Sequence, residues 1–279
     1  MRCAWQELLR IIPPRMRSSV DRFGKNDLQE LRLRIGSKVM LCMQQENRIL
    51  DMVTSREDLE FIINTASNYS PWNAVSISKG YITAPGGHRI GICGTCVVQN
   101  GVITGVRNAD SICIRVARDF PGIAANINAE DSVLILGSPG SGKTTLLRDL
   151  IRQLSLKSNR SIGVVDERGE IFCDLGLDAG EKTDVITGCD KMNGIMILLR
   201  TMGPEWIAVD EITDENDCEA MIQAGWCGVR LIATAHASSL SDLYHRPIYQ
   251  KLRTSGLFSQ FVVMHPDKSY HVERMKLCT

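Results

Sequence analysis

The sequence predicts an α/β fold: a mostly parallel sheet with helices on both faces, preceded by a smaller α+β domain. Short apolar runs such as residues 133–136 and 207–209 alternate with helical segments, and continuous apolar runs are typical of strands buried in a parallel sheet. The pattern changes after Phe120-Pro121-Gly122, which places a boundary near residues 118–124. We therefore expect one domain over residues 1–120 and a second over residues 121–279.

The expected elements of the first domain are a helix broken at Pro13-Pro14 within residues 3–22, a strand pair over 28–43, a helix over 54–68 and short β-runs over 75–117. Those of the second domain are strands at 132–136, 161–165, 206–209 and 229–234, with helices at 144–156, 189–201 and 216–224. The first domain carries no self-sufficient catalytic motif, so chemistry is expected in the second.

Composition narrows the class of protein. Of 279 residues, 44% are hydrophobic and 23% are charged, as in ordinary soluble domains. Lys+Arg and Asp+Glu balance at 32 each, which makes binding to nucleic acid unlike this chain. The sequence lacks both a transmembrane-length apolar run and a signal-peptide pattern, so a cytoplasmic protein with reduced thiols is expected. Cys93 and Cys96 have metal-like spacing, but with no second such pair we interpret them as structural thiols.

Residues 137–144 match the phosphate-loop pattern G-x-x-x-x-G-K-[ST], after an expected strand and at the start of an expected helix. Such a loop turns backbone N–H groups towards phosphate oxygens at the positive end of the helix dipole. Lys143 is expected to reach the β- and γ-phosphates, and Thr144 to hold Mg²⁺. The motif predicts a P-loop RecA-like (ASCE) domain with ATP and Mg²⁺ as cofactors. The expected nucleotide-binding residues are Gly137, Ser138, Pro139, Gly140, Ser141, Gly142, Lys143, Thr144 and Thr145.

Two acidic clusters follow expected strands. Asp210 and Glu211 end the run at 206–209, where P-loop ATPases use one acid to support Mg²⁺ and the next to polarise the attacking water. Asp166 and Glu167, with Glu170 nearby, end the preceding strand. Because the ends of parallel strands converge on one crevice, Glu167 is expected to face the same γ-phosphate. The alternative for this second cluster is a solvated charged turn.

Further candidates are polar or cationic. Thr234 and His236 follow another strand, where either could sense the γ-phosphate through a hydrogen bond. Arg200, just before the Asp210 strand, is a candidate for a fixed cation near the site, or else a surface arginine that favours the helix dipole. Arg115 and Arg118 are candidates for the arginine that P-loop ATPases often deliver to the transition state.

The order of these motifs over residues 130–240 resembles the secretion-type ATPases of type II and type IV systems, which are hexameric rings with an amino-terminal α+β domain. Two features depart from that pattern: Asp-Glu stands where many of those enzymes have Gly-Glu, and the chain ends soon after the core. Residues 31–36, 80–94, 114–118 and 163–170 resemble the stage III sporulation protein AA family.

That resemblance implies a homo-oligomeric, hexamer-type ATPase at the cytoplasmic face of the mother-cell membrane, with membrane channel proteins of the same sporulation complex as partners. The block at residues 80–94 suggests no chemistry, and it packs against a nucleotide or neighbouring subunit, or forms a structural hairpin. Two other classes stay open: a P-loop protein that binds single-stranded nucleic acid, and a nucleotide-gated scaffold with negligible turnover. Neutral charge argues against the former, and Glu211 with Glu167 makes hydrolysis chemically feasible.

Overall fold

The computed structural model describes residues 1–24, 26–43, 45–67, 80–158, 160–172 and 178–275. The chain divides into two compact units, with the break between Asp119 and Phe120. We call them the amino-terminal unit and the carboxy-terminal unit. In the described ranges, no helix has both the length and the apolar character that a bilayer crossing requires.

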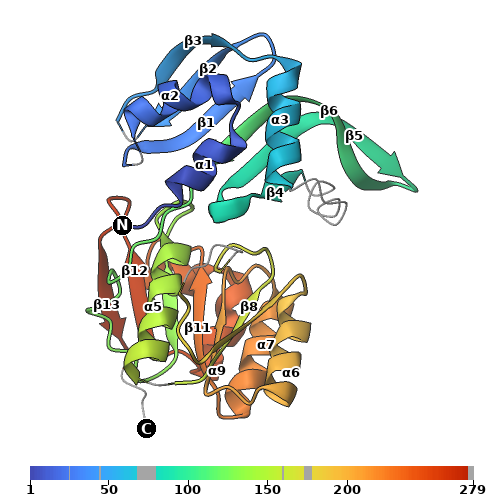
Figure 1. Ribbon diagram of the computed structural model, residues 1–279. Helices are drawn as coiled ribbons and strands as arrows, with labels where there is room; N and C mark the ends of the chain where they lie inside the picture. Colours follow the sequence, from blue (N-terminus) through green and yellow to red (C-terminus); the bar gives the residue numbers. More distant parts are fainter. Residues whose placement is uncertain (25, 44, 68–79, 159, 173–177, 276–279) are drawn as a thin grey trace. The chain divides into compact units, whose positions relative to one another are not determined.

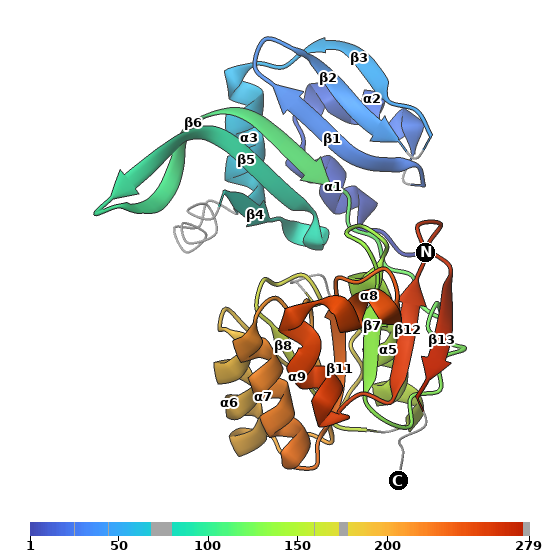
Figure 2. The same ribbon diagram turned by 180° about the vertical axis from the view of Figure 1, so that it is seen from behind.

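The amino-terminal unit is a six-stranded sheet, ordered β3-β2-β1-β6-β5-β4 with antiparallel neighbours, that packs against three helices (Figures 1 and 2). Its elements are α1 (Trp5–Ile11), α2 (Pro14–Phe23), β1 (Leu28–Arg34), β2 (Lys38–Met43), β3 (Arg48–Val53), α3 (Arg56–Ala66), β4 (Tyr81–Thr83), the 3₁₀ turn η2 (Pro85–Gly87), β5 (Arg89–Gln99) and β6 (Val102–Arg115). The first helix breaks at Pro13-Pro14, where Pro14 opens α2. Ser55 caps α3, and Asp58 completes a capping box.

The strands β5 and β6 correct one expectation. In place of short β-runs, the described part of residues 75–117 holds a long hairpin that turns at Asn100 and Gly101, both with positive φ. The register shifts between Cys93 and Thr95, and again between Val97 and Val98. Each irregularity interrupts the alternation of apolar and polar residues, so one long ribbon has the pattern of several short strands. Residues 75–79 lie outside the described residues.

The block at residues 80–94 holds the two ends of the amino-terminal unit together. Gly86 has φ +80°, and a Cβ placed there would lie 2.7 Å from Cβ of Ala4. His88 is buried, its Nδ1 accepts from the backbone N–H of Ala117 at 3.1 Å, and its Nε2 lies 3.0 Å from the carbonyl oxygen of Ala4. Since Nδ1 accepts, Nε2 carries the proton and donates it. Burial lowers the pKa of His88 and so favours this neutral ring.

The carboxy-terminal unit is a seven-stranded sheet, ordered β13-β12-β7-β11-β10-β8-β9, in which only the edge pair β12–β13 is antiparallel (Figure 2). Its elements are β7 (Val133–Leu136), α5 (Lys143–Ser158), β8 (Ile162–Asp166), β9 (Thr183–Thr187), α6 (Lys191–Thr201), β10 (Trp206–Val209), α7 (Glu215–Trp226), β11 (Arg230–Ala235), α8 (Leu240–His245), the 3₁₀ turn η3 (Pro247–Tyr249), α9 (Gln250–Ser255), β12 (Gln260–Met264) and β13 (Tyr270–Arg274). Strands β9, β12 and β13 were not expected.

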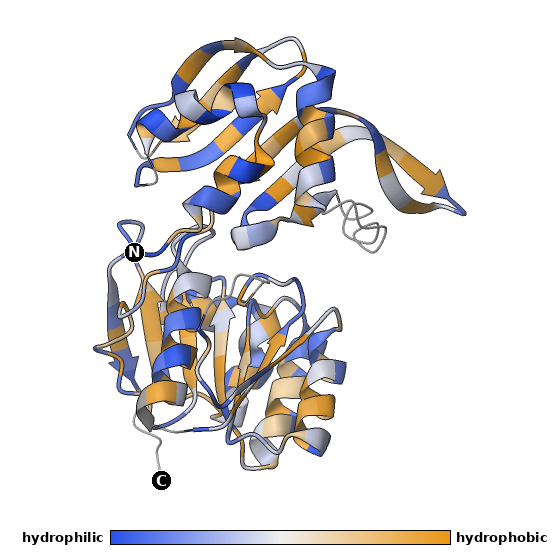
Figure 3. Ribbon diagram, viewed as in Figure 1, coloured by the Kyte–Doolittle hydropathy of each residue, from blue (hydrophilic) through white to orange (hydrophobic). Residues whose placement is uncertain are grey.

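Two apolar clusters cover the two faces of this sheet. On one face, α5 contributes Leu147 and Ile151 to a core that includes Ile135 and Ile232. On the other face, α6, α7 and α9 pack on strand residues of the opposite parity, Val209 among them. The apolar strands between hydrophilic helix surfaces are visible in Figure 3. The expected α/β organisation, with helices on both faces of a mostly parallel sheet, is therefore present.

Candidate nucleotide-binding site

The strand register assembles the site. Val209 at the end of β10 pairs with Val165 on β8 and with Ala233 on β11. The next residue of each strand end, namely Asp210, Asp166 and Thr234, therefore stands at the same edge of the sheet. Parallel strands bring their carboxyl ends together in this way, and ligands of open α/β sheets bind there.

The loop between β7 and α5 has a conformation that needs glycine. Gly140 and Gly142 have φ values of +76° and +102°. At Gly137, a Cβ would lie 2.4 Å from Oγ of Ser141 and 2.9 Å from Cβ of Met264, so no larger residue fits. The helix that follows begins at Lys143, and its first-turn N–H groups have no partner within the helix. Ser138, Pro139 and Gly140 are exposed, and Thr145 lies half-buried in the first turn of α5.

The buried ammonium group of Lys143 contacts three acceptors. Its Nζ lies 3.0 Å from the carbonyl oxygens of Gly137 and Ser138, and 3.1 Å from Nδ1 of His236. Since an ammonium group only donates, Nδ1 of His236 accepts and Nε2 carries the ring proton, which points to Oε1 of Glu211 at 2.9 Å. Burial lowers the pKa of Lys143, while the charges of Asp210 and Glu211 act in the opposite direction.

A hydroxyl group lies on either side of the Asp210 carboxylate. Thr144 donates to Oδ2 of Asp210 at 2.7 Å, and the buried Thr234 donates to Oδ1 at 2.5 Å. A threonine hydroxyl and a carboxylate, together with phosphate oxygens and water, form the usual coordination of protein-bound Mg²⁺. Among the described residues, no group of three or more His, Cys, Asp or Glu side chains could hold a metal. The donor set thus fits a cation shared with phosphate better than an all-protein metal site.

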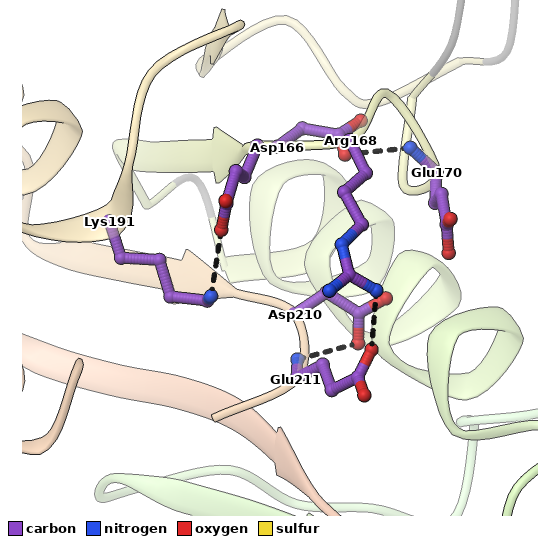
Figure 4. A pocket seen from close by; sticks show the side chains of 7 residues that line it. Asp166, Arg168, Glu170, Lys191, Asp210 and Glu211 are labelled. Carbon is purple, nitrogen blue, oxygen red and sulfur yellow. Dashed lines mark hydrogen bonds and ion pairs between the residues drawn. The ribbon is translucent and has the colours of Figure 1, made fainter. Parts of the chain in front are cut away.

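Glu211 has a left-handed backbone, with φ +47°, which is uncommon outside glycine and costs energy for a side chain of this kind. Its N–H donates to Oγ1 of Thr234 at 2.8 Å, which holds this conformation. The two oxygens of its carboxylate then meet different partners, His236 at Oε1 and Nη1 of Arg168 at Oε2, 3.1 Å away (Figure 4). Local strain at this strand end therefore directs an acid into the site.

A narrow pocket joins the two acidic clusters (Figure 4). It is lined by Asp166, Glu167, Arg168, Glu170, Lys191, Asp210 and Glu211. Asp166 differs from the expectation that it faces a phosphate: its buried carboxylate accepts from the backbone N–H groups of Glu170, Ile171 and Phe172 at 2.7–2.9 Å. Burial raises the pKa of Asp166, and these three donors oppose that rise. Its role is to fold the following turn.

Glu167 lies in the same pocket, where Nζ of Lys191 is 2.9 Å from its carboxylate. Lys191 is buried at the start of α6 and also pairs with Asp217 at 3.2 Å. Although burial works against the charged ammonium, the hydrogen bond to Glu167 and the charge of Asp217 raise the pKa of Lys191. This lysine was not among the expected site residues.

The candidate arginines lie elsewhere. Arg200 is exposed in the last turn of α6, nine residues beyond Lys191 and so about 14 Å away along the helix at 1.5 Å per residue. It belongs to the edge of the sheet opposite the strand ends, which corrects the expectation of a fixed cation beside Asp210 within this chain. In the amino-terminal unit, Arg115 is exposed and pairs with Glu30 at 3.4 Å, and the half-buried Arg118 donates to the carbonyl oxygen of Leu28.

Sequence analysis named Arg168 only as part of the acidic cluster and gave it no role. The signal was a cation two residues beyond the end of a buried strand, between Glu167 and Glu170. Cys93 and Cys96 are exposed on β5.

A parallel sheet with a glycine-rich loop between β7 and α5, and with acids at the ends of β8 and β10, defines an α/β protein with the fold of secretion ATPases. The pilus retraction motor PilT, solved with bound ADP, matches 90% of this chain and 80% of its own with a TM-score of 0.62 and 13% identity. The ATPase DotB of Legionella pneumophila matches 88% of this chain and 75% of its own, with a TM-score of 0.56 and 20% identity.

The chain belongs to the family described as "Sporulation stage III, protein AA", whose sequence model matches residues 4–273. Stage III sporulation protein AA of Bacillus subtilis (strain 168) is 35% identical over 274 residues, which cover 92% of this chain and 89% of that protein. The family expected from the sequence is thereby confirmed.

Proposed function

We propose that this chain is a Mg²⁺-dependent ATP hydrolase of the secretion-motor type, with its active site at the strand ends of the carboxy-terminal unit. The observation that supports this most is the convergence of Lys143, Thr144, Asp210, Glu211 and His236 in one hydrogen-bonded cluster. These residues come from α5, the end of β10 and the end of β11, and their types are those that phosphoryl transfer requires.

Each residue has a distinct role in this proposal. Lys143 exchanges its contacts with the loop carbonyls for β- and γ-phosphate oxygens, and Thr144 and Asp210 provide oxygen ligands or second-sphere support for Mg²⁺. Bound Mg²⁺ neutralises charge that develops on the phosphates. Glu211 orients a water molecule and accepts its proton, while His236, between Lys143 and Glu211, links phosphate occupancy to that acid. Glu167 acts from the neighbouring strand end.

The cellular role follows from the family. We propose that hydrolysis energises a channel complex between mother cell and forespore, and that the protein works as a homo-oligomeric ring, a hexamer by analogy, at the cytoplasmic face of the mother-cell membrane. Channel proteins of the same complex are its proposed partners. The name of the Bacillus subtilis relative and the motor titles of the structural neighbours support this proposal. Arg115 and Arg118 are the proposed sources of an arginine supplied to a neighbouring subunit's nucleotide.

Nucleotide binding tests the loop assignment. Lys143→Ala removes the ammonium group that would contact the phosphates, so we expect its affinity for Mg·ATP to fall at least a hundredfold in equilibrium binding. Lys182→Ala changes an exposed lysine of the same unit and serves as the matched control, with unchanged affinity expected. Equal affinity in the two variants would contradict the assignment.

Steady-state hydrolysis tests the acid. Glu211→Gln is expected to bind Mg·ATP as the wild type does and to lose at least a hundredfold in turnover, because an amide cannot accept the proton. The exposed Glu181→Gln variant is the control. Normal turnover in Glu211→Gln would transfer the catalytic role to Glu167 or Glu170. Tight binding without any turnover in the wild type would favour the nucleotide-gated scaffold.

A further inference from the structure

We propose that Arg168 is a positioning residue for hydrolysis: it holds the Glu211 carboxylate in the orientation from which Glu211 acts on water. This inference rests on the proposed function, because it assigns Arg168 a part in the same reaction. It is carried by the contacts around one carboxylate and by the way in which the turn after β8 is built.

The Glu211 carboxylate is held from two sides. Arg168 Nη1 lies 3.1 Å from Oε2, and His236 Nε2 lies 2.9 Å from Oε1. In Figure 4 the guanidinium group of Arg168 reaches across the pocket to Glu211. One contact alone leaves a carboxylate free to rotate about its terminal torsion, which is broad. Two donors on different oxygens fix that torsion, and so fix the direction in which the acid faces.

The turn that carries Arg168 is rigid for a reason independent of Glu211. The buried carboxylate of Asp166 binds three successive backbone N–H groups, and the N–H of Gly169 donates to the carbonyl oxygen of Asp166 at 3.2 Å. Gly169 has φ +66°, as the turn requires. Because β8 and β10 are adjacent in the sheet, this turn delivers Arg168 to the strand end that carries Glu211.

The charge arrangement also favours Arg168. Of the cations that line the pocket in the described part of the chain, Lys191 is engaged by Glu167 and Asp217, and Arg168 is the one that contacts Glu211. About half of the Arg168 side chain is exposed, at 53%. Exposed ion pairs contribute little to folding, so orientation of the acid accounts for this pair better than stability does.

The kinetic test separates positioning from binding. We expect Arg168→Ala to lower kcat about tenfold, since small misplacement of a reacting group costs this much or more, while the Kd for Mg·ATP stays within about twofold. Arg168→Lys retains a cation without the planar fork and should recover part of the loss. Arg160→Ala removes another exposed arginine–glutamate pair, with Glu205, and should leave kcat unchanged. A kcat for Arg168→Ala within twofold of the Arg160→Ala value would overturn the proposal.

A second measurement does not depend on hydrolysis. The ¹⁵N relaxation of the Arg168 Nε–H group in the full chain reports how firmly the guanidinium is held. We expect its order parameter to fall in Glu211→Ala and to stay unchanged in Glu181→Ala. If wild-type turnover is absent but this order parameter falls, the proposed function fails while the contact stands. An order parameter that is equal in both variants refutes the positioning role.

Discussion

Replacement of Thr234 by valine removes a single hydroxyl group on which two site residues depend. Oγ1 of Thr234 donates to Asp210 at 2.5 Å and accepts from the N–H of Glu211 at 2.8 Å. Valine has nearly the same shape, so it deletes both bonds without opening a cavity. Serine keeps the hydroxyl and loses only a methyl group, which makes Thr234→Ser the matched control.

The magnitude follows from the nature of the two bonds. A hydrogen bond to a charged group is worth about 1.5–3 kcal/mol and a neutral one about 1 kcal/mol. Asp210 keeps its bond from Thr144, and the Glu211 N–H keeps a longer bond of 3.1 Å to Asp210, so part of the loss is recovered. We expect Thr234→Val to destabilise the carboxy-terminal unit by about 2–3 kcal/mol. Thr234→Ser should cost about 1 kcal/mol for the methyl group.

Native-state hydrogen exchange of the β11 amides measures this loss within one unit, which suits a chain of two units better than a single unfolding transition. Turnover should fall in parallel, because Glu211 loses the acceptor that holds its left-handed backbone. We expect Thr234→Val to exchange faster than Thr234→Ser and to hydrolyse ATP more slowly. Indistinguishable exchange and turnover in the two variants would refute the role of the hydroxyl group.

Three other predictions concern residues outside this cluster. Because burial lowers the pKa of His88, the unfolded chain binds a proton more readily, so the amino-terminal unit should lose stability as pH falls below about 6.5; urea titration at several pH values should show this dependence abolished in His88→Gln. Gly86→Ala should destabilise that unit more than Gly36→Ala does, since both have positive φ but only the former meets Ala4; equal urea midpoints would contradict this. Arg200→Ala should hydrolyse ATP within about twofold of wild type, and a tenfold loss would restore Arg200 to the site.

Local signals in the sequence were enough to predict the parts of the site that lie in one segment. The loop from Gly137 to Thr144 combines glycines, a lysine and a hydroxyl at fixed spacing, and Asp210 follows a fully buried strand. The parallel alternation of strands and helices then placed these strand ends at one edge. The residues found together in the structure agree with that placement, and their roles in catalysis stay predictions.

Contacts between segments could not be predicted in this way. Arg168 meets Glu211 only because β8 and β10 are neighbours in the sheet, and spacing along the chain does not give strand order. The same holds for Lys191 and Glu167. Asp166 resembled a site acid because carboxylates that accept backbone N–H groups and carboxylates that face ligands have the same sequence pattern.

The unexpected strands have different explanations. β9 and β13 lie at the sheet edges with mixed exposure, so their apolar pattern is weak. β12 carries a buried apolar run that was a legible strand signal and was overlooked, because the analysis of elements ended at residue 234. For Arg200, distance along the chain was misleading: the residue precedes β10, but the start of a parallel strand is the end remote from the site.

The most direct test of the central claim is an experimental structure of Glu211→Gln with Mg²⁺ and ATP. The account predicts the γ-phosphate beside Lys143, with Thr144 and Asp210 around the metal and residue 211 facing the γ-phosphate at the ends of β8 and β10. A nucleotide bound elsewhere, or bound at the loop with residue 211 directed away from the γ-phosphate, would contradict it.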